Sequence, residues 1–151
     1  YPQSEFIPKA MLTIGDHYYN IRSYEEALSN YLNLVRTFPN TEEAAKAKPF
    51  IDELKDIQAT ADYNEVMKFF DAEEYKKAVA GLKTVVEKYP GTYTELAAYV
   101  NIGLAYEYLG QYPEAAEYYQ KVLEKGEGAF EHVDVITFAK SHLDWIVGKK
   151  M

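Results

Sequence analysis

The chain repeats itself, and an internal repeat constrains the fold of a sequence more than any other feature. When the sequence is shifted by 88 residues, Ile14-Gly15 falls on Ile102-Gly103 and Glu26-Ala27 falls on Glu114-Ala115. The same shift superimposes four pairs of tyrosines: Tyr1 and Tyr89, Tyr18 and Tyr106, Tyr24 and Tyr112, Tyr31 and Tyr119. A shift of 51 residues places Pro39 on Pro90, Tyr24 on Tyr75 and Ala27 on Ala78. The chain therefore contains three copies of one unit, at about residues 1–39, 40–90 and 89–126.

The second half of each unit has the pattern of an amphipathic helix. Its apolar residues recur at i, i+3, i+4 and i+7, which places them on one face at 3.6 residues per turn. In the three copies this face consists of Tyr24, Ala27, Leu28, Tyr31, Leu34, Val35 and Phe38; Tyr75, Ala78, Val79, Leu82, Val85, Val86 and Tyr89; and Tyr112, Ala115, Ala116, Tyr119, Val122 and Leu123.

The first half of each unit predicts a partner helix, at about Ser4–Asn20 in the first copy and Thr92–Leu109 in the third. Gly15 and Gly103 lie inside these helices, where glycine costs about 1 kcal/mol relative to alanine. Their recurrence at one place predicts a close approach between the paired helices. We expect the small residues opposite them to be Ala27, Ala78 and Ala115.

Local signals mark where the helices begin and end. Ser23 with Glu26, and Thr92 with Glu95, have the spacing of a capping box. Pro39 and Pro90 end second helices and begin new units. No segment of alternating apolar and polar residues has the length of a strand, so the sequence predicts an almost entirely helical protein.

The middle unit is longer than the other two. From the proline to the tyrosine that opens the second helix there are 22 residues in the outer units (Pro2 to Tyr24, Pro90 to Tyr112) and 36 in the middle one (Pro39 to Tyr75). The extra 14 residues make close to four helical turns, so the apolar face keeps its phase. This predicts one elongated first helix, which Pro49 either kinks or splits. A last helix, at about 129–147, is expected to cover the end of the stack.

The repeated residues resemble the tetratricopeptide pattern. Gly15, Tyr18, Ala27, Tyr31 and Pro39 match it in the first unit, and the third unit matches at Gly103, Tyr106, Ala115 and Tyr119 but carries Glu127 in place of proline. The second unit departs from it, with Val66 for glycine and Leu82 for the aromatic residue, and keeps Phe69, Ala78 and Pro90. The resemblance implies an all-α solenoid of three helix pairs with a C-terminal capping helix, forming one domain over residues 1–151. It also implies protein–protein recognition as the function.

A narrower resemblance concerns the BamD-like outer-membrane assembly lipoproteins and related bacterial envelope repeat proteins. It rests on the Tyr-Pro-x-Ser start, the elongated middle helix and the sequence Thr-Val-Val-Glu-Lys-Tyr-Pro at 84–90. It implies a scaffold for envelope assembly in the periplasm or at the outer membrane. The lipid-bearing cysteine of such proteins is missing, and we expect the chain to be part of a longer protein whose N-terminus could carry an anchor. The alternative is a repeat segment of a cytoplasmic assembly or regulatory protein.

Composition and spacing argue against several other functions. Sixteen Lys and Arg against 24 Asp and Glu give a net charge of −8, which repels phosphate backbones, so we expect no nucleic acid partner. There is no cysteine, and no apolar run approaches the ~20 residues of a membrane span. We expect no metal, no cofactor and no catalysis: Glu131, Asp134 and His142 are interpreted as solvated surface residues, and no Ser-His-Asp arrangement follows from the spacing.

The remaining candidate is a binding surface for a protein or peptide. In tetratricopeptide domains, certain first-helix positions line a concave groove, and the resemblance maps them onto aromatic, apolar and acidic residues of this chain. The basic clamp of chaperone-binding relatives is absent, because Leu12 and Val100 stand in its places. The predicted partner segment is apolar with Lys or Arg at its margins; the oligomeric state stays open. An alternative is that the aromatic residues only pack in the core. The predicted groove consists of Asp16, Tyr19, Tyr63, Met67, Phe70, Leu104, Glu107 and Tyr108.

Overall fold

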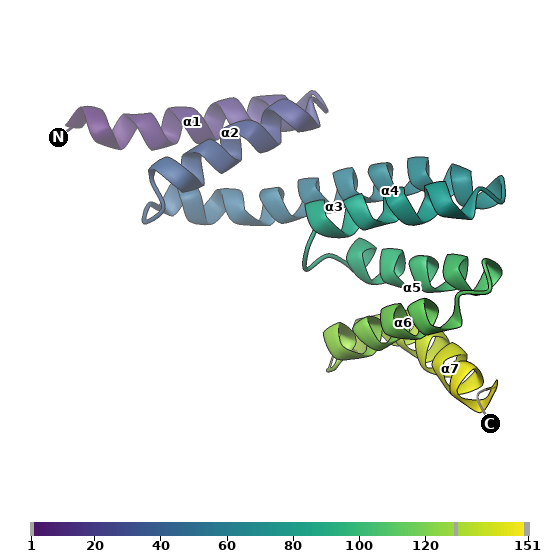
Figure 1. Cartoon of the computed structure of the whole chain (residues 1–151). Helices are drawn as coiled ribbons and strands as arrows, with labels where there is room; N and C mark the ends of the chain where they lie inside the picture. Colours follow the sequence, from purple (N-terminus) through teal and green to yellow (C-terminus); the bar gives the residue numbers. More distant parts are fainter. Residues whose placement is uncertain (1, 129, 150–151) are drawn as a thin grey trace. The chain divides into compact units, whose positions relative to one another are not determined.

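The computed structural model describes residues 2–128 and 130–149, and side chains from Glu5 onward except that of Phe130. Over these residues it contains seven α-helices, one short 3-10 helix and no strand, which confirms the predicted all-α class (Figure 1). The elements in chain order are α1 (Pro2–Asn20), α2 (Tyr24–Thr37), α3 (Glu42–Asp71), α4 (Tyr75–Lys88), α5 (Tyr93–Tyr108), α6 (Tyr112–Gly126), η1 (Phe130–His132) and α7 (Val133–Lys149).

The helices form two compact units, residues 1–57 and 58–151, and α3 contributes to both. In the first unit, α2 packs against α1 and against the first half of α3, around a buried cluster of Ala27, Leu28, Tyr31, Leu34, Ala47, Ile51 and Leu54. In the second unit, α4 packs against α5 and α5 packs against α6. The core that these helices share includes Val79, Leu82, Val85, Ala98, Ile102, Ala115, Tyr119 and Val122. The single domain expected over 1–151 stays a prediction.

The last helix covers α6 and also contacts α5 (Figure 1). It contributes buried Ala139 and Ile146 to the core of the second unit, as a terminal helix of a stack should. Its α-helical part begins at Val133, after the 3-10 turn of η1. The predicted start at Ala129 lies outside the described residues.

The elongated helix is continuous, so the alternative that Pro49 splits it is wrong. α3 runs for 30 residues from Glu42 to Asp71 with Pro49 inside it. Proline removes one hydrogen bond to the carbonyl four residues earlier, here that of Ala45. Pro49 and Ala45 are both exposed, so water can satisfy that carbonyl without a break in the core.

The recurring glycines mark tight contacts between paired helices, as predicted, but the residue opposite them is not alanine. A Cβ added to Gly15 would lie 2.5 Å from Cε1 of Tyr31, and one added to Gly103 would lie 2.7 Å from Cε1 of Tyr119. The expectation that Ala27, Ala78 and Ala115 face the glycines is wrong: these alanines are fully buried, but the tyrosine ring one turn later fills the space that glycine leaves.

In the middle unit the glycine lies on the second helix of the pair and not on the first. Val66 replaces the first-helix glycine, and the glycine appears instead on the second helix, where a Cβ on Gly81 would lie 2.7 Å from Cγ1 of Val66. Leu82 stands where the other units have tyrosine and is fully buried. Each unit thus pairs a missing side chain on one helix with a larger side chain on the other.

The turns between paired helices share one backbone geometry. Arg22, Glu73 and Gly110 occupy equivalent places and have φ values of 63°, 61° and 73°. The amide after each of them donates to the carbonyl five residues earlier, as in Ser23 N to Tyr18 O at 2.9 Å and Gln111 N to Tyr106 O at 2.8 Å. This hydrogen bond is that of a Schellman motif, which favours glycine at the left-handed position. All three turns form the motif, but only the third has glycine there, at Gly110.

One of the two predicted capping boxes is formed in part: its cap bond is present, but its glutamate accepts from the amide one residue before the cap. The Thr92 side chain accepts a hydrogen bond from the Glu95 amide at 3.2 Å, and Glu95 in return accepts from the Gly91 amide at 2.8 Å. Ser23 makes no side-chain cap bond, so that prediction is wrong. Thr92 has an extended backbone, with a ψ of 159°, which directs its hydroxyl toward the helix. Ser23 has a ψ of only 73°, because it directly follows Arg22, whose backbone is left-handed.

Candidate peptide-binding surface

The two predicted groove residues of the first unit are engaged within that unit. The Tyr31 hydroxyl donates to Oδ1 of Asp16 at 2.6 Å. The Tyr19 hydroxyl donates to both carboxylate oxygens of Glu53 at 3.0 Å, which raises the pKa of Tyr19. The Tyr19 ring also meets the ring of Phe50 edge to face, with centroids 5.0 Å apart. Both residues therefore tie α1 to neighbouring helices while remaining partly exposed.

In the second unit, two predicted groove residues join a third aromatic to form a cluster. The rings of Tyr75 and Tyr108 stack with centroids 4.8 Å apart, and Phe70 meets both edge to face at 5.3 and 6.0 Å. The three side chains come from α4, α5 and α3 respectively. Tyr108 is 60% exposed, whereas Phe70 and Tyr75 pack against the core. We call this set, Phe70, Tyr75 and Tyr108, the aromatic platform.

The other apolar groove residues are less accessible. Tyr63 and Met67 are half-buried and pack against the core of the second unit. The Tyr63 hydroxyl accepts a hydrogen bond from Nδ2 of Asn101 at 2.6 Å, and burial raises the pKa of Tyr63. Leu104 is half-buried as well. The binding role of the eight groove residues stays a prediction, and Tyr108 is the aromatic among them that presents most of its surface.

Glu107 connects three helices at the predicted groove. Its Oε1 accepts a hydrogen bond from the Tyr119 hydroxyl on α6 at 2.7 Å and lies 2.7 Å from Nδ1 of His142 on α7. The Glu107 side chain is 12% exposed and that of His142 is 29% exposed. Burial, together with this hydrogen bond, raises the pKa of Tyr119 well above its usual range, so the hydroxyl remains a donor to the carboxylate.

The interpretation of His142 as a solvated surface residue is wrong. Its ring stacks on Phe138 with centroids 4.0 Å apart and approaches Tyr119 at 5.5 Å. No spacing in the sequence indicates this contact, because the two partners lie 35 residues apart, on α5 and α7.

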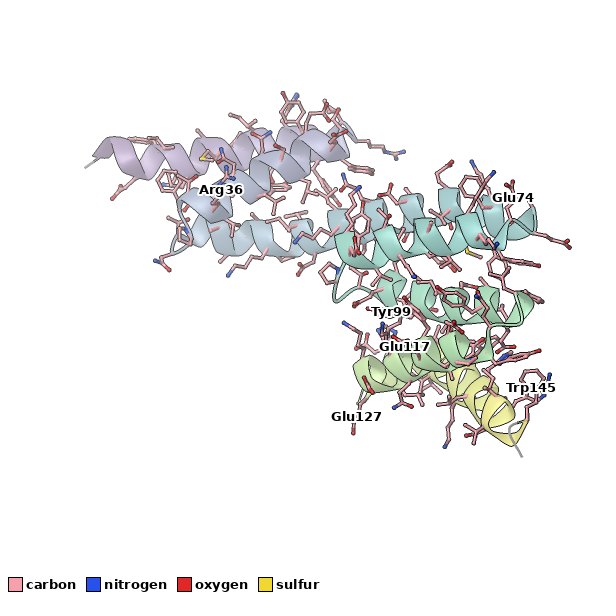
Figure 2. The ribbon with its side chains drawn as sticks, in the orientation of Figure 1. Arg36, Glu74, Tyr99, Glu117, Glu127 and Trp145 are labelled. Carbon is pink, nitrogen blue, oxygen red and sulfur yellow. The ribbon has the colours of Figure 1, made fainter. Side chains whose placement is uncertain are left out.

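A cavity of about 290 Å³ opens beside this hydrogen-bonded pair, and Glu107, Ser141, His142 and Trp145 line it. Trp145 lies on α7 (Figure 2) and is 48% exposed. Its ring meets Tyr112 edge to face at 5.8 Å, and the Lys149 ammonium lies 4.2 Å from its centroid.

Other features of the described residues give no separate site. Across residues 5–128 and 131–149, no three His, Asp and Glu side chains are placed to hold a metal ion. Asp134, one of the acids considered for such a role, accepts a hydrogen bond from the Tyr93 hydroxyl at 3.1 Å. No helix within the described ranges is long and apolar enough to cross a membrane.

Comparison with known proteins identifies one repeat. Residues 96–125, which cover most of α5 and α6, match the tetratricopeptide repeat family. The N-terminal domain of stress-induced protein-1 (STI-1) from C. elegans is a similar solved structure, with 14% sequence identity, a TM-score of 0.40, and coverage of 90% of this chain and 94% of that one. No curated protein matches. The chain therefore contains a tetratricopeptide repeat within an all-helical repeat fold; such repeats generally mediate protein–protein interaction and are generally non-catalytic.

Proposed function

We propose that the chain is a scaffold that binds a protein or peptide segment, and that the aromatic platform with Glu107 is part of its binding surface. The observation that carries this proposal is the exposure of Tyr108, whose ring is held in place by stacking on Tyr75 and by the edge of Phe70. A rigid, exposed aromatic side chain binds at low entropic cost, and such residues are enriched among interface hot spots.

Charge favours an apolar segment that carries basic residues. The chain has a net charge of −8, and Glu107 lies one residue from Tyr108. Opposite charge on the partner would raise its association rate, and salt would reduce that gain. Met67, half-buried beside the same core, adds an adaptable apolar contact.

The test uses peptides selected from a random library on the immobilised chain. Affinities of the selected peptides are then measured for the wild type, Tyr108→Ala and Lys77→Ala. Tyr108→Ala should weaken binding by about 1–2 kcal/mol, and the helical signal should not change because the side chain is exposed. Lys77 lies on α4 and pairs with Glu74, the residue before that helix; it serves as a surface control and should have no effect. Loss of binding in Lys77→Ala with full binding in Tyr108→Ala would contradict the proposal.

We also propose, from the sequence resemblance to BamD-like lipoproteins, that the scaffold works in assembly of the bacterial envelope. The elongated α3 supports this narrower proposal, since a long middle helix is its most specific element. A cytoplasmic assembly or regulatory protein is the alternative. The first ~30 residues of the full-length gene product decide between them: a signal peptide followed by a lipidated cysteine favours the envelope, and a start without one favours the alternative.

A further inference from the structure

We propose that the cavity lined by Glu107, Ser141, His142 and Trp145 is a recognition pocket for the side-chain ammonium of a lysine in the bound segment. This inference rests on the proposed function and specifies which chemical group of the partner one part of the binding surface recognises. All four lining residues belong to the second unit, on α5 and α7.

Glu107 supplies the negative charge of the pocket. Both of its hydrogen bonds, from Tyr119 and His142, go to Oε1 at 2.7 Å. Its Oε2 accepts no hydrogen bond from any residue that the structure describes, and the same residues contain no buried polar side-chain atom without a partner. Oε2 is therefore in reach of solvent, in a carboxylate that is itself mostly buried. Such an oxygen can accept a charge-assisted bond from a ligand.

His142 is held in one orientation beside the carboxylate. An ionised carboxylate only accepts hydrogen bonds, so Nδ1 of His142 carries the proton that points to Glu107. Stacking on Phe138 at 4.0 Å fixes the orientation of the ring.

Trp145 provides an aromatic wall that already attracts a cation. The Lys149 ammonium lies 4.2 Å from the Trp145 centroid and 4.6 Å from that of Tyr112, both within the range of about 6 Å for cation–π attraction. Trp145 and Tyr112 thus already bind the ammonium of Lys149. These rings can also cover the methylene chain of an incoming lysine, whose apolar stem packs well on aromatic surface.

The size of the pocket and its single free acceptor oxygen favour lysine over arginine. About 290 Å³ is at the lower end for ligand sites, which suits one side chain better than a whole small molecule. Arginine binds carboxylates best through two parallel bonds to both oxygens. Oε1 of Glu107 already accepts from two donors, so one oxygen remains, and a compact ammonium can use it.

The experiment uses the single tryptophan of the chain as its reporter. The 151-residue protein is titrated with N-acetyl-lysine methylamide, its arginine analogue and the uncharged norleucine analogue, and the Trp145 indole and Ser141 amide signals are followed by NMR. The lysine probe should give saturable shifts, the arginine probe should bind more weakly, and norleucine should bind at least about fivefold more weakly, because it lacks the charge. Equal binding of norleucine, tighter binding of arginine, or no shift with any probe would overturn the proposal.

Two variants test the role of the carboxylate. Glu107→Gln keeps an acceptor for Tyr119 and His142 but removes the charge, and it should weaken the lysine probe about fivefold or more. Glu124→Gln, an exposed change of equal charge on α6, should leave the affinity unchanged. Undiminished lysine binding in Glu107→Gln would overturn the proposal, as would shifts produced by acetate instead of lysine. Because the probe is a single residue, its failure leaves the Tyr108 peptide test of the proposed function intact, and the reverse also holds.

Discussion

Replacing Gly103 with alanine should destabilise the protein although alanine is the better helix former. An added Cβ would lie 2.7, 2.9 and 3.0 Å from three carbon atoms of the Tyr119 ring, whereas carbon atoms pack best at about 3.5–4.0 Å. The ring must therefore move by close to about 1 Å. It has little room, because Tyr119 is fully buried and its hydroxyl is bound to Glu107 at 2.7 Å.

The size of the effect follows from two opposing contributions. Alanine gains about 1 kcal/mol in helix propensity, and overpacking a core costs about 1–3 kcal/mol. Since the ring is confined on both sides, we expect the upper part of that range and a net loss of about 1–2 kcal/mol. For a chain of 151 residues, each kcal/mol lowers the melting temperature by roughly 2–4 °C.

Gly148 gives a matched control for this measurement. It lies in α7, and a Cβ there would meet no atom within 4 Å. Gly148→Ala should therefore stabilise by up to about 1 kcal/mol, less if the helix end frays. Urea denaturation followed by far-UV circular dichroism compares the two variants with the wild type. If Gly103→Ala were as stable as Gly148→Ala, the contact with Tyr119 would not be tight and the proposed reason for the recurring glycine would be refuted.

Three further predictions follow from caps, turns and titration. Thr92→Ala should cost about 1 kcal/mol in urea denaturation because it removes a formed cap, whereas Ser23→Ala should lie within about 0.5 kcal/mol of the wild type; equal effects would contradict this. Arg22→Gly should stabilise, because it relieves a left-handed backbone at a non-glycine residue; a lower melting temperature would refute it. The pKa of Tyr119 is raised in the folded protein, so its contribution is present below the unfolded value of about 10 and is lost as the pH rises above it. Tyrosinate absorbance and helical signal in an alkaline titration should show ionisation together with unfolding, and ionisation of every tyrosine without unfolding would contradict this.

The sequence predicted the features that depend on periodicity. The apolar spacing from Tyr24, Tyr75 and Tyr112 placed the second helices correctly at their first residue. The phase argument for 14 extra residues correctly predicted one long helix, but it left open whether Pro49 would split it. That outcome depends on whether the orphaned carbonyl faces water, which a one-dimensional pattern does not contain.

Features that depend on side-chain direction were harder to predict. Spacing alone made Ser23 and Thr92 equivalent caps, but the turn before Ser23 rotates its hydroxyl away from the helix. Spacing also placed alanine opposite glycine, although a tyrosine one turn later reaches the same space. His142 was missed because its partner Glu107 lies 35 residues earlier, on another helix, and the spacing of residues along the chain does not relate the two.

The size-matched pairs between helices restrict how these repeats can diverge from one another. Glycine faces tyrosine in the outer units, and Val66 faces Gly81 in the middle one. To pass from one arrangement to the other in single steps, a repeat must cross an intermediate with either a clash, at about 1–3 kcal/mol, or a void, at about 2–5 kcal/mol. Against a total stability of about 5–15 kcal/mol, either intermediate removes a large share. The two arrangements differ at three positions, because Val66, Gly81 and Leu82 correspond to Gly15, Asn30 and Tyr31 of the first unit. This contact can therefore change without a large loss of stability only if residues on both helices change together.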